Sequence, residues 1–368
     1  MQLIQDSKSY PLLPSASKRA MEQSYQARLP EHFLMQTAGL RVAQLAQALQ
    51  AHAQIFWLVC GPGNNGGDGL IAACCLHQKG KKVRLTYCGD SSKAPIDAAW
   101  ALAKAQSLGI HIETQIPEAS FLDSVDCVID AMLGIGATRP LQGLMAECAA
   151  QINQLNAFVL AVDIPSVLFA YTGAVLTSEA TLTEKNSSDD NRVIADATLA
   201  LIALSAGLFT ASGKDVAGDV WLDELVEEKK GQLNGFDFSP IAFLAAAPQT
   251  MARPNSSHKG SFGAVAVIAG AEGMQGAAIL AATAALKAGA GKVYLSLLSP
   301  TPCSHPIRAD LMQRTVSELA LTDSKNLKDL TVVAGCGGGH QVAQVLPLLL
   351  ANAERLVLDA DALNRLAE

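Results

Sequence analysis

The sequence predicts an α/β protein, with a Rossmann-like, doubly wound parallel sheet followed by a second and shorter α/β domain. Apolar runs typical of strands alternate with helical segments along most of the 368 residues. Half of the residues are hydrophobic and only 5% are aromatic, as expected for parallel sheets that helices cover on both faces. Five glycines lie within 59–69, directly after the apolar run 55–59, a pattern typical of a strand, a tight loop and a helix start.

The first domain, residues 1–228, is expected to begin with two helices, one starting near Ser15 or Ser17 and one over Pro30–Ala51. A strand at 55–59 leads through the glycine loop into a helix at 68–79. The alternation continues with strands at 83–88, 110–112, 127–131 and 158–164 and with helices at 94–108 and 141–155. Because strand–helix–strand units of this length form parallel sheets, the carboxyl ends of these strands should share one edge.

The second domain, residues 254–368, is expected to follow a polar linker at 229–253. It starts with a strand, a glycine-rich loop and a helix, and Gly335 opens another glycine-rich loop after a later strand. These loops are typical of nucleotide binding, although the signal is weaker than in the first domain. The segment has room for only three or four strands before Glu368, which is short for an independent doubly wound domain. The expected strands are 264–269, 292–298, 331–334 and 355–359, and the helix is 277–288.

The composition favours a cytoplasmic protein that binds small molecules. A net charge of −7 and a pI of about 5.5 argue against nucleic acid and against membrane surfaces as partners. The eight cysteines form no CxxC pair and are expected to be reduced core residues. The N-terminus has no signal-peptide pattern, and the uncharged stretches 197–213 and 273–286 are short for a membrane span. The polar stretch 178–191 is expected to be an exposed loop rather than a metal site.

The glycine-rich segment Gly61–Gly69 is the strongest candidate for a ligand-binding loop. A strand followed by such a loop and a helix turns backbone N–H groups toward an anion. Asn64, Asn65 and Asp68 add side-chain acceptors, so one loop can hold a phosphate, a ribose and a cation. A plain strand–turn–helix corner is the alternative, but it needs one or two glycines rather than five. Further along the chain, Arg139 follows two more glycines and can pair with a phosphate.

Two aspartates follow apolar strands at the same predicted sheet edge. Asp130 ends the strand 127–131, where a buried carboxylate needs a partner, and Asn65 and Ser166 can supply neutral oxygens. Such a set suits a sodium or potassium ion, but Asp130 as a cap of the following loop is an equally good interpretation. Asp163, which precedes a proline turn, is the best candidate for a general acid/base, with an Asx-turn as the alternative.

The motifs at Gly61–Gly69, Asp130–Pro140 and Val162–Ser166 resemble those of the NAD(P)H-hydrate epimerase family, as does the helical segment Met35–Gly39. From His258 onward the chain is similar to the ADP/ATP-dependent NAD(P)H-hydrate dehydratases, which have a ribokinase-like fold. The segments that carry this second resemblance are 258–260, 273–278, 289–291 and 357–364. The order of the two parts is that of the bacterial bifunctional NAD(P)H-hydrate repair enzymes.

The resemblance implies a metabolite-repair enzyme. The epimerase part interconverts the R and S hydrates of NADH and NADPH, and the dehydratase part removes water from the S form with ADP or ATP and Mg²⁺. Asp163 would be catalytic, a potassium ion would be held by Asn65, Asp130 and Ser166, and the chain would form homo-oligomers. The hydrated dinucleotide would contact Asn64, Asn65, Gly66, Gly67, Asp68, Gly134, Ile135, Gly136, Ala137, Thr138, Arg139, Pro140, Asp163 and Gly335.

The chain departs from the family pattern at several positions. Val167 stands where the family usually has glycine, and valine would be strained if the backbone there needs a positive φ. Tyr171 replaces a common acidic residue and Ser205 a frequent lysine. The dehydratase motifs that follow Asp361 in the family are missing, so with Glu368 as the native terminus the second domain should lack dehydratase activity and expose an apolar sheet edge. A ribokinase-like kinase and a non-catalytic binding module are the alternative functions.

Overall fold

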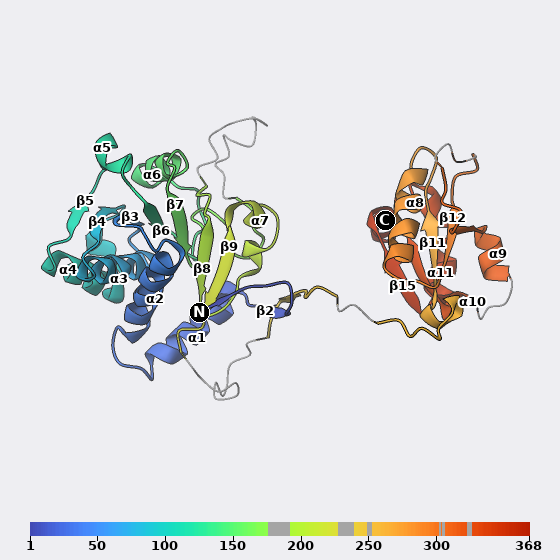
Figure 1. Cartoon of the computed structure of the whole chain (residues 1–368), viewed down its shortest axis with the longest axis horizontal. Coiled ribbons are helices and arrows are strands. Elements are labelled where there is room, and N and C mark those ends of the chain that lie inside the picture. Colours follow the sequence, from blue (N-terminus) through green and yellow to red (C-terminus); the bar gives the residue numbers. More distant parts are fainter. Residues whose placement is uncertain (176–191, 227–238, 249–251, 302, 304–305, 322–325) are drawn as a thin grey trace. The chain divides into compact units, whose positions relative to one another are not determined.

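The computed structural model describes residues 1–175, 192–226, 239–248, 252–301, 303, 306–321 and 326–368 (Figure 1). These residues form two units, Met1–Pro248 and Gln249–Glu368. The predicted loop at 178–191 lies outside the described residues. Strand β10 (Ala242–Leu244) pairs with β2 (Tyr10–Leu12), so part of the predicted linker 229–253 is hydrogen-bonded to the first unit.

The first unit is built on an eight-stranded sheet with the order β1-β9-β8-β7-β6-β3-β4-β5. The chain runs outward from β3 through β4 to β5, returns to β6 beside β3 and then continues in the opposite direction to β9. All neighbours are parallel except β1, which is antiparallel to β9, so the predicted doubly wound sheet is confirmed. The strands are β1 (Gln2–Leu3), β3 (Ile55–Cys60), β4 (Lys82–Tyr87), β5 (His111–Glu113), β6 (Cys127–Ala131), β7 (Phe158–Val162), β8 (Ala197–Leu201) and β9 (Asp219–Asp223).

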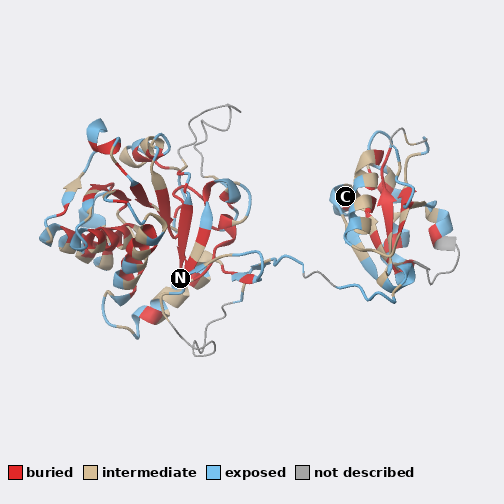
Figure 2. Cartoon of the chain, viewed as in Figure 1, coloured by how far each residue is buried: buried red, intermediate tan, exposed pale blue. Residues whose placement is uncertain are grey.

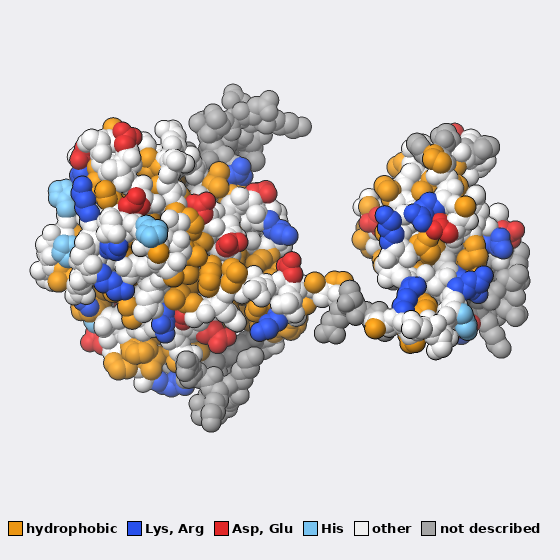
Figure 3. All heavy atoms as spheres, viewed as in Figure 1, with side chains coloured by type: hydrophobic (Ala, Val, Ile, Leu, Met, Phe, Trp, Pro, Cys, Tyr) orange, Lys and Arg blue, Asp and Glu red, His pale blue; other side chains and the backbone are white. Residues whose placement is uncertain are grey.

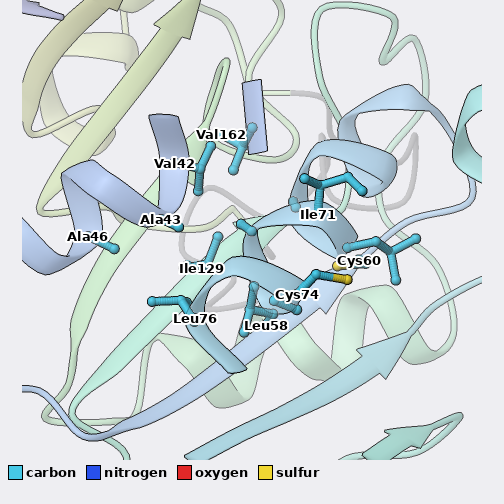
Figure 4. Close-up of a cluster of buried hydrophobic side chains, with 14 of the residues drawn as sticks. Val42, Ala43, Ala46, Leu58, Cys60, Ile71, Cys74, Leu76, Ile129 and Val162 are labelled. Carbon is cyan, nitrogen blue, oxygen red and sulfur yellow. The ribbon is translucent and has the colours of Figure 1, made fainter. Parts of the chain in front are cut away.

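Helices cover both faces of this sheet, because alternate residues of each buried strand point to opposite sides. In β3, Phe56, Leu58 and Cys60 belong to the cluster beneath α2, α3 and α4, part of which Figure 4 shows. Trp57 and Val59 belong to the cluster on the other face, beneath α5 and α6. The helices are α1 (Ser15–Gln26), α2 (Phe33–Leu49), α3 (Asn64–Gln78), α4 (Ile96–Ser107), α5 (Ala119–Leu122), α6 (Leu144–Ile152) and α7 (Gly213–Val216), with short 3-10 helices at Ser91–Lys93 and Ala206–Leu208.

The first unit differs from the sequence prediction in two places. Helix α3 begins at Asn64 rather than at residue 68, so most of the predicted glycine loop forms the first turns of a helix. The glycines are needed there for close packing, because a Cβ at Gly66 would overlap the Gly61 carbonyl oxygen and one at Gly69 would lie 2.5 Å from the Ala131 Cβ. The residues before the first helix, for which no strand was predicted, form β1 and β2.

The second unit has a parallel five-stranded sheet with the order β13-β12-β11-β14-β15. Helix α8 covers one face, and α10, α11 and α12 cover the other. The strands are β11 (Ala264–Ala269), β12 (Lys292–Leu297), β13 (Met312–Gln313), β14 (Leu330–Ala334) and β15 (Arg355–Leu358). The helices are α8 (Gln275–Lys287), α9 (Val316–Leu321), α10 (Asn326–Asp329), α11 (Leu346–Asn352) and α12 (Ala360–Ala367), with 3-10 helices at Lys259–Phe262 and Gln341–Gln344.

Burial follows the sheets in both units, where the central strands and the helix faces that pack on them are buried (Figure 2). In the second unit, Val357 on the edge strand β15 is 53% exposed. All eight cysteines are free, and five of them are buried, as predicted. Acidic and basic side chains are interspersed on the visible face of each unit (Figure 3). Within the described part of the chain, no helix combines the length and the apolar character that a membrane span needs.

Candidate functional site

A cavity of about 460 Å³ lies at the carboxyl ends of β3 and β6 in the first unit. The order of the strands reverses between these two neighbours, and ligands of doubly wound sheets bind at such a switch point. The cavity is lined by α1, by the first turns of α2 and α3, by the loop after β6 and by the residue that follows β7. The fold therefore brings the three strand-end segments that the sequence singled out to one place.

Eight of the predicted substrate-contacting residues line this cavity, and the others do not. Gly66 and Gly67 are buried inside α3, where they pack against Gly61 and Met35 respectively. Gly335 belongs to the second unit, and the exposed Thr138 and Arg139 and the following Pro140 lie outside the lining. The lining residues are Asn64, Asn65, Asp68, Gly134, Ile135, Gly136, Ala137 and Asp163.

Asp130 is fully buried and is held by hydrogen bonds from its surroundings. Ser166 donates to its carboxylate from the backbone N–H at 2.9 Å and from Oγ at 2.7 Å, and the Met132 N–H donates at 3.1 Å. Burial raises the pKa of Asp130 above its usual value, although the bonds from Ser166 and Met132 oppose that shift. The bond from Met132 is the one that the cap interpretation expects, while the bonds from Ser166 join the ends of β6 and β7.

The Asn65 side chain is the observation that favours a bound ligand next to its amide. Both of its polar atoms are buried and have no hydrogen-bond partner among the described residues. Leaving a buried amide without hydrogen bonds costs free energy, so its polar atoms indicate a site where a ligand binds. Gly134 leaves room beside it, since a Cβ there would lie 3.3 Å from the Asn65 Oδ1. An amide oxygen, a hydroxyl and one carboxylate fit a weakly charged, oxygen-seeking ion such as potassium.

Asp163 faces the cavity and forms an ion pair there. The Lys18 Nζ on α1 donates to its Oδ1 at 2.8 Å, and the side chains are only 3% and 12% exposed. The Leu201 N–H donates to the same oxygen at 3.4 Å. Among the described residues, the carboxylate makes no bond to the turn that follows it, so the Asx-turn interpretation is not supported. The backbone of Asp163 has a φ of 65°, a conformation uncommon for a residue other than glycine and typical of functional sites.

Further carboxyl groups surround the pair of Lys18 and Asp163. Burial, with the nearby charges of Glu22 and Asp163, raises the pKa of Asp68 well above its usual value. Burial first, and then the charge of Asp163, also raises the pKa of Glu22, against a bond from the Asn64 amide at 3.4 Å. The cavity thus places two carboxyl groups of raised pKa beside an ion-paired carboxylate, and environments that push the pKa values of neighbouring carboxyl groups apart are typical of acid/base sites.

Helix α1 was missed as part of the site. Its residues Lys18, Glu22 and Gln26 line the cavity, together with Arg19. The spacing of four residues places Lys18, Glu22 and Gln26 on one face of a helix, and this face is polar. That polar stripe on a correctly predicted helix was the available signal. The helix begins at Ser15, with Pro14 at the N-cap position and no side-chain hydrogen bond that caps it.

The departures from the family pattern have distinct structural consequences. Val167 has a φ of 80°, so the predicted requirement for a positive φ is confirmed, and a β-branched residue is strained there. Ser205 is buried, and its hydroxyl has no hydrogen-bond partner among the described residues. The lysine that contacts Asp163 is Lys18, which lies on α1. Tyr171 is 55% exposed.

Gly335 in the second unit is explained by packing. Its φ is 107°, and a Cβ there would overlap the carbonyl oxygen of Asp359. Further along the same loop, the Gly339 N–H donates to the Asp361 carboxylate at 2.8 Å. These contacts account for glycine in this loop without a ligand, and the role of Gly335 in binding stays a prediction.

The fold and the cavity define a doubly wound α/β protein with a ligand site at its switch point. The family model described as the YjeF-related protein N-terminus matches residues 31–207, and the one described as NAD(P)H-hydrate dehydratase matches residues 265–368. The chain belongs to the family of bifunctional NAD(P)H-hydrate repair enzymes, as its relatives also show.

Three such relatives have similar identities. The bifunctional NAD(P)H-hydrate repair enzyme Nnr of Gloeobacter violaceus is 32% identical over 93% of this chain and 68% of its own length. The enzymes of the same name from Coxiella burnetii and Escherichia coli are each 31% identical, over 92% and 91% of this chain and 67% and 62% of their own lengths. The chain thus spans between 62% and 68% of the length of these relatives. The crystal structure of yeast ynu0 aligns with a TM-score of 0.42 at 18% identity, covering 53% of this chain and 81% of that one.

Proposed function

We propose that the first unit is an epimerase for the hydrates of NADH and NADPH. The observation that carries this proposal is the cavity at the switch point, in which Asp163 is paired with Lys18 and faces a space that Glu22 and Asp68, two carboxyl groups of raised pKa, also line. Membership of the repair-enzyme family supplies the substrate class, since the relatives are named for NAD(P)H-hydrate repair. The same membership favours this function over a small-molecule kinase or a binding module.

Epimerisation requires the bond between the hydrated carbon and its oxygen to break and to form again on the opposite face, or the ring to open and close. Loss of the hydroxyl as water takes up a proton at the oxygen, and re-addition of water releases one. Asp163 is proposed to give and take this proton, a role that needs a carboxyl group within reach of the substrate. Lys18 would hold the carboxylate in place through the observed contact at 2.8 Å.

We further propose that Asn65, Asp130 and Ser166 hold a potassium ion. The support is the buried Asn65 amide, which has no partner among the described residues, and the buried carboxylate of Asp130, which is bonded to the Ser166 hydroxyl. A bound potassium ion would offset the charge of Asp130 and order the substrate-facing loop. Substrate contacts by the predicted residues that line the cavity belong to the same proposal, whereas Gly66, Gly67, Thr138, Arg139 and Pro140 have no support from the lining.

The second unit is proposed to take part in nucleotide-dependent dehydration of the S hydrate, with ADP or ATP and Mg²⁺. Its support is the match of residues 265–368 to the NAD(P)H-hydrate dehydratase model. Incubation of the S hydrate with ADP or ATP and Mg²⁺ tests this activity, with NAD(P)H absorbance as the readout. We also propose that the two domains span residues 1–228 and 254–368. The protein is proposed to be cytoplasmic and homo-oligomeric, and to have neither nucleic-acid nor membrane partners.

The epimerase proposal is tested with the pure R hydrate of NADPH and no added nucleotide. Chromatographic separation of the two epimers over time should show conversion to a mixture of R and S faster than in buffer alone. The Asp163→Asn variant, with a parent-like circular dichroism spectrum, should convert at the rate of buffer. The proposal would be refuted if, at saturating potassium, the parent chain interconverts the epimers no faster than buffer alone does.

A further inference from the structure

Arg19 occupies a distinct place on the cavity wall. It lies on the same helix as Lys18, and its guanidinium reaches the loop after β6, where the Nη2 lies 3.3 Å from the position of a Cβ at Gly136. The other end of that short loop, at Gly134, lies against the Asn65 amide. The loop thus connects the proposed cation site to Arg19.

The charges that line the cavity leave Arg19 as the cation available to a ligand. Among the described lining residues the cations are Lys18 and Arg19, and Lys18 is taken up by its ion pair with Asp163. Arg19 has no hydrogen bond or ion pair to any described residue, and its side chain is exposed. The remaining charged residues of the lining are acidic, so a negatively charged ligand group is favoured only near Arg19.

The neighbouring loop offers further donors. Among the described residues, the backbone N–H groups of Gly134, Ile135 and Gly136 have no acceptor, whereas the Ala137 N–H bonds to the Gly134 carbonyl. Consecutive free amides beside a guanidinium are the donors that phosphate groups bind in proteins. Arg139, the phosphate-pairing residue that the sequence favoured, is exposed and outside the lining.

We infer that Arg19 makes the ionic contact to a phosphate group of the dinucleotide, together with the free amides of Gly134–Gly136. The inference rests on the proposed function, because it takes its ligand from the hydrated dinucleotide. It adds a specificity residue from α1 and orients the ligand, with a phosphate at the Arg19 end of the cavity and the reacting ring toward Asp163. NADH and NADPH share a diphosphate, and NADPH adds a 2′-phosphate, so the two phosphate sources can be distinguished.

The experiment compares Arg19→Gln and Arg19→Lys with the parent chain. Calorimetric titration with NADP⁺ and NAD⁺ should show about tenfold weaker binding for Arg19→Gln. Arg19→Lys should lose less affinity, because lysine keeps the positive charge but lacks the paired donors of the guanidinium. Loss for both dinucleotides assigns the diphosphate, and loss for NADP⁺ alone assigns the 2′-phosphate. In epimerisation, KM should rise while kcat stays close to that of the parent, because the contact is the same in ground and transition states.

The matched control is Lys79→Gln, which removes one positive charge directly after the C-terminal end of α3, away from its cavity-lining first turn. It should bind both dinucleotides as the parent does. The inference is overturned if Arg19→Gln also binds both as the parent does, or if Arg139→Gln shows the loss instead. Binding is measured without turnover. A parent chain that binds NADP⁺ through Arg19 but does not epimerise therefore refutes the proposed function and leaves the phosphate contact standing.

Discussion

Asp130 and Asp163 lie at the carboxyl ends of neighbouring strands of one sheet, and in the sequence they look alike. Each comes at the end of an apolar run and precedes a turn. In the structure, Asp130 is fully buried and bonded by backbone and hydroxyl donors, whereas Asp163 faces a cavity and is bonded by a lysine from a distant helix. The hydrogen-bonding partners, and not the strand-end pattern, distinguish the carboxylate proposed to hold a cation from the one proposed to move a proton.

The largest effect is expected from Asp163→Asn. The variant keeps the shape and an acceptor for Lys18 but cannot carry a proton, so epimerisation should fall by about 10²–10⁴-fold, the range of general acid/base catalysis. Initial rates of epimer conversion measure this. Asp123→Asn, on the exposed end of α5, is the control and should retain the parent rate. Parent-like turnover in Asp163→Asn would show that Asp163 is not the proton carrier.

Removal of Lys18 tests the partner instead of the carboxylate. Lys18→Met leaves Asp163 without its cation, and breaking a buried ion pair in this way costs about 3–5 kcal/mol. Ser166→Ala removes a neutral donor from Asp130 and should cost less, about 1–3 kcal/mol. Urea unfolding of both variants measures the difference. Equal losses would show that the two aspartates depend on their partners alike.

The raised pKa of Asp68 predicts a pH dependence of stability. Because the folded state binds this proton more tightly than the unfolded chain does, the contribution of Asp68 is fully present below about pH 4, its unfolded pKa. It is lost as the pH rises toward the folded pKa. The free energy of unfolding of Asp68→Asn, relative to that of the parent, should therefore increase between pH 4 and pH 8. A constant difference over this range would contradict the shift.

The smallest effect is expected at Val167. Glycine there relieves a strained backbone, worth about 1–3 kcal/mol, while the loss of the buried side chain costs a similar amount. Val167→Gly should therefore change the free energy of unfolding by less than about 1 kcal/mol. Val159→Gly, in the same cluster but on strand β7, should cost several times more. Equal losses in thermal or urea unfolding would show that Val167 is not strained.

The fold was largely predictable because strand and helix periods are local. The strand 127–131 was predicted with the observed bounds, and the doubly wound order follows from the alternation. The start of α3 was not predictable. In the sequence the glycines indicate a loop, whereas in the structure they allow close packing within a helix. Lys18 and Arg19 were missed because the polar face of α1, although visible in the sequence, does not show where that face packs.

Epimerisation rates at increasing potassium concentration, measured in parallel for Asn65→Ala and Asp163→Asn, test the division of roles most directly. Asn65→Ala should weaken the cation site, so its rate should be low at low potassium and rise toward the parent rate at high potassium. Asp163→Asn should stay at the buffer rate at every concentration, since no cation replaces the missing proton carrier. Rescue of Asp163→Asn by potassium, or the same flat response in both variants, would contradict the account.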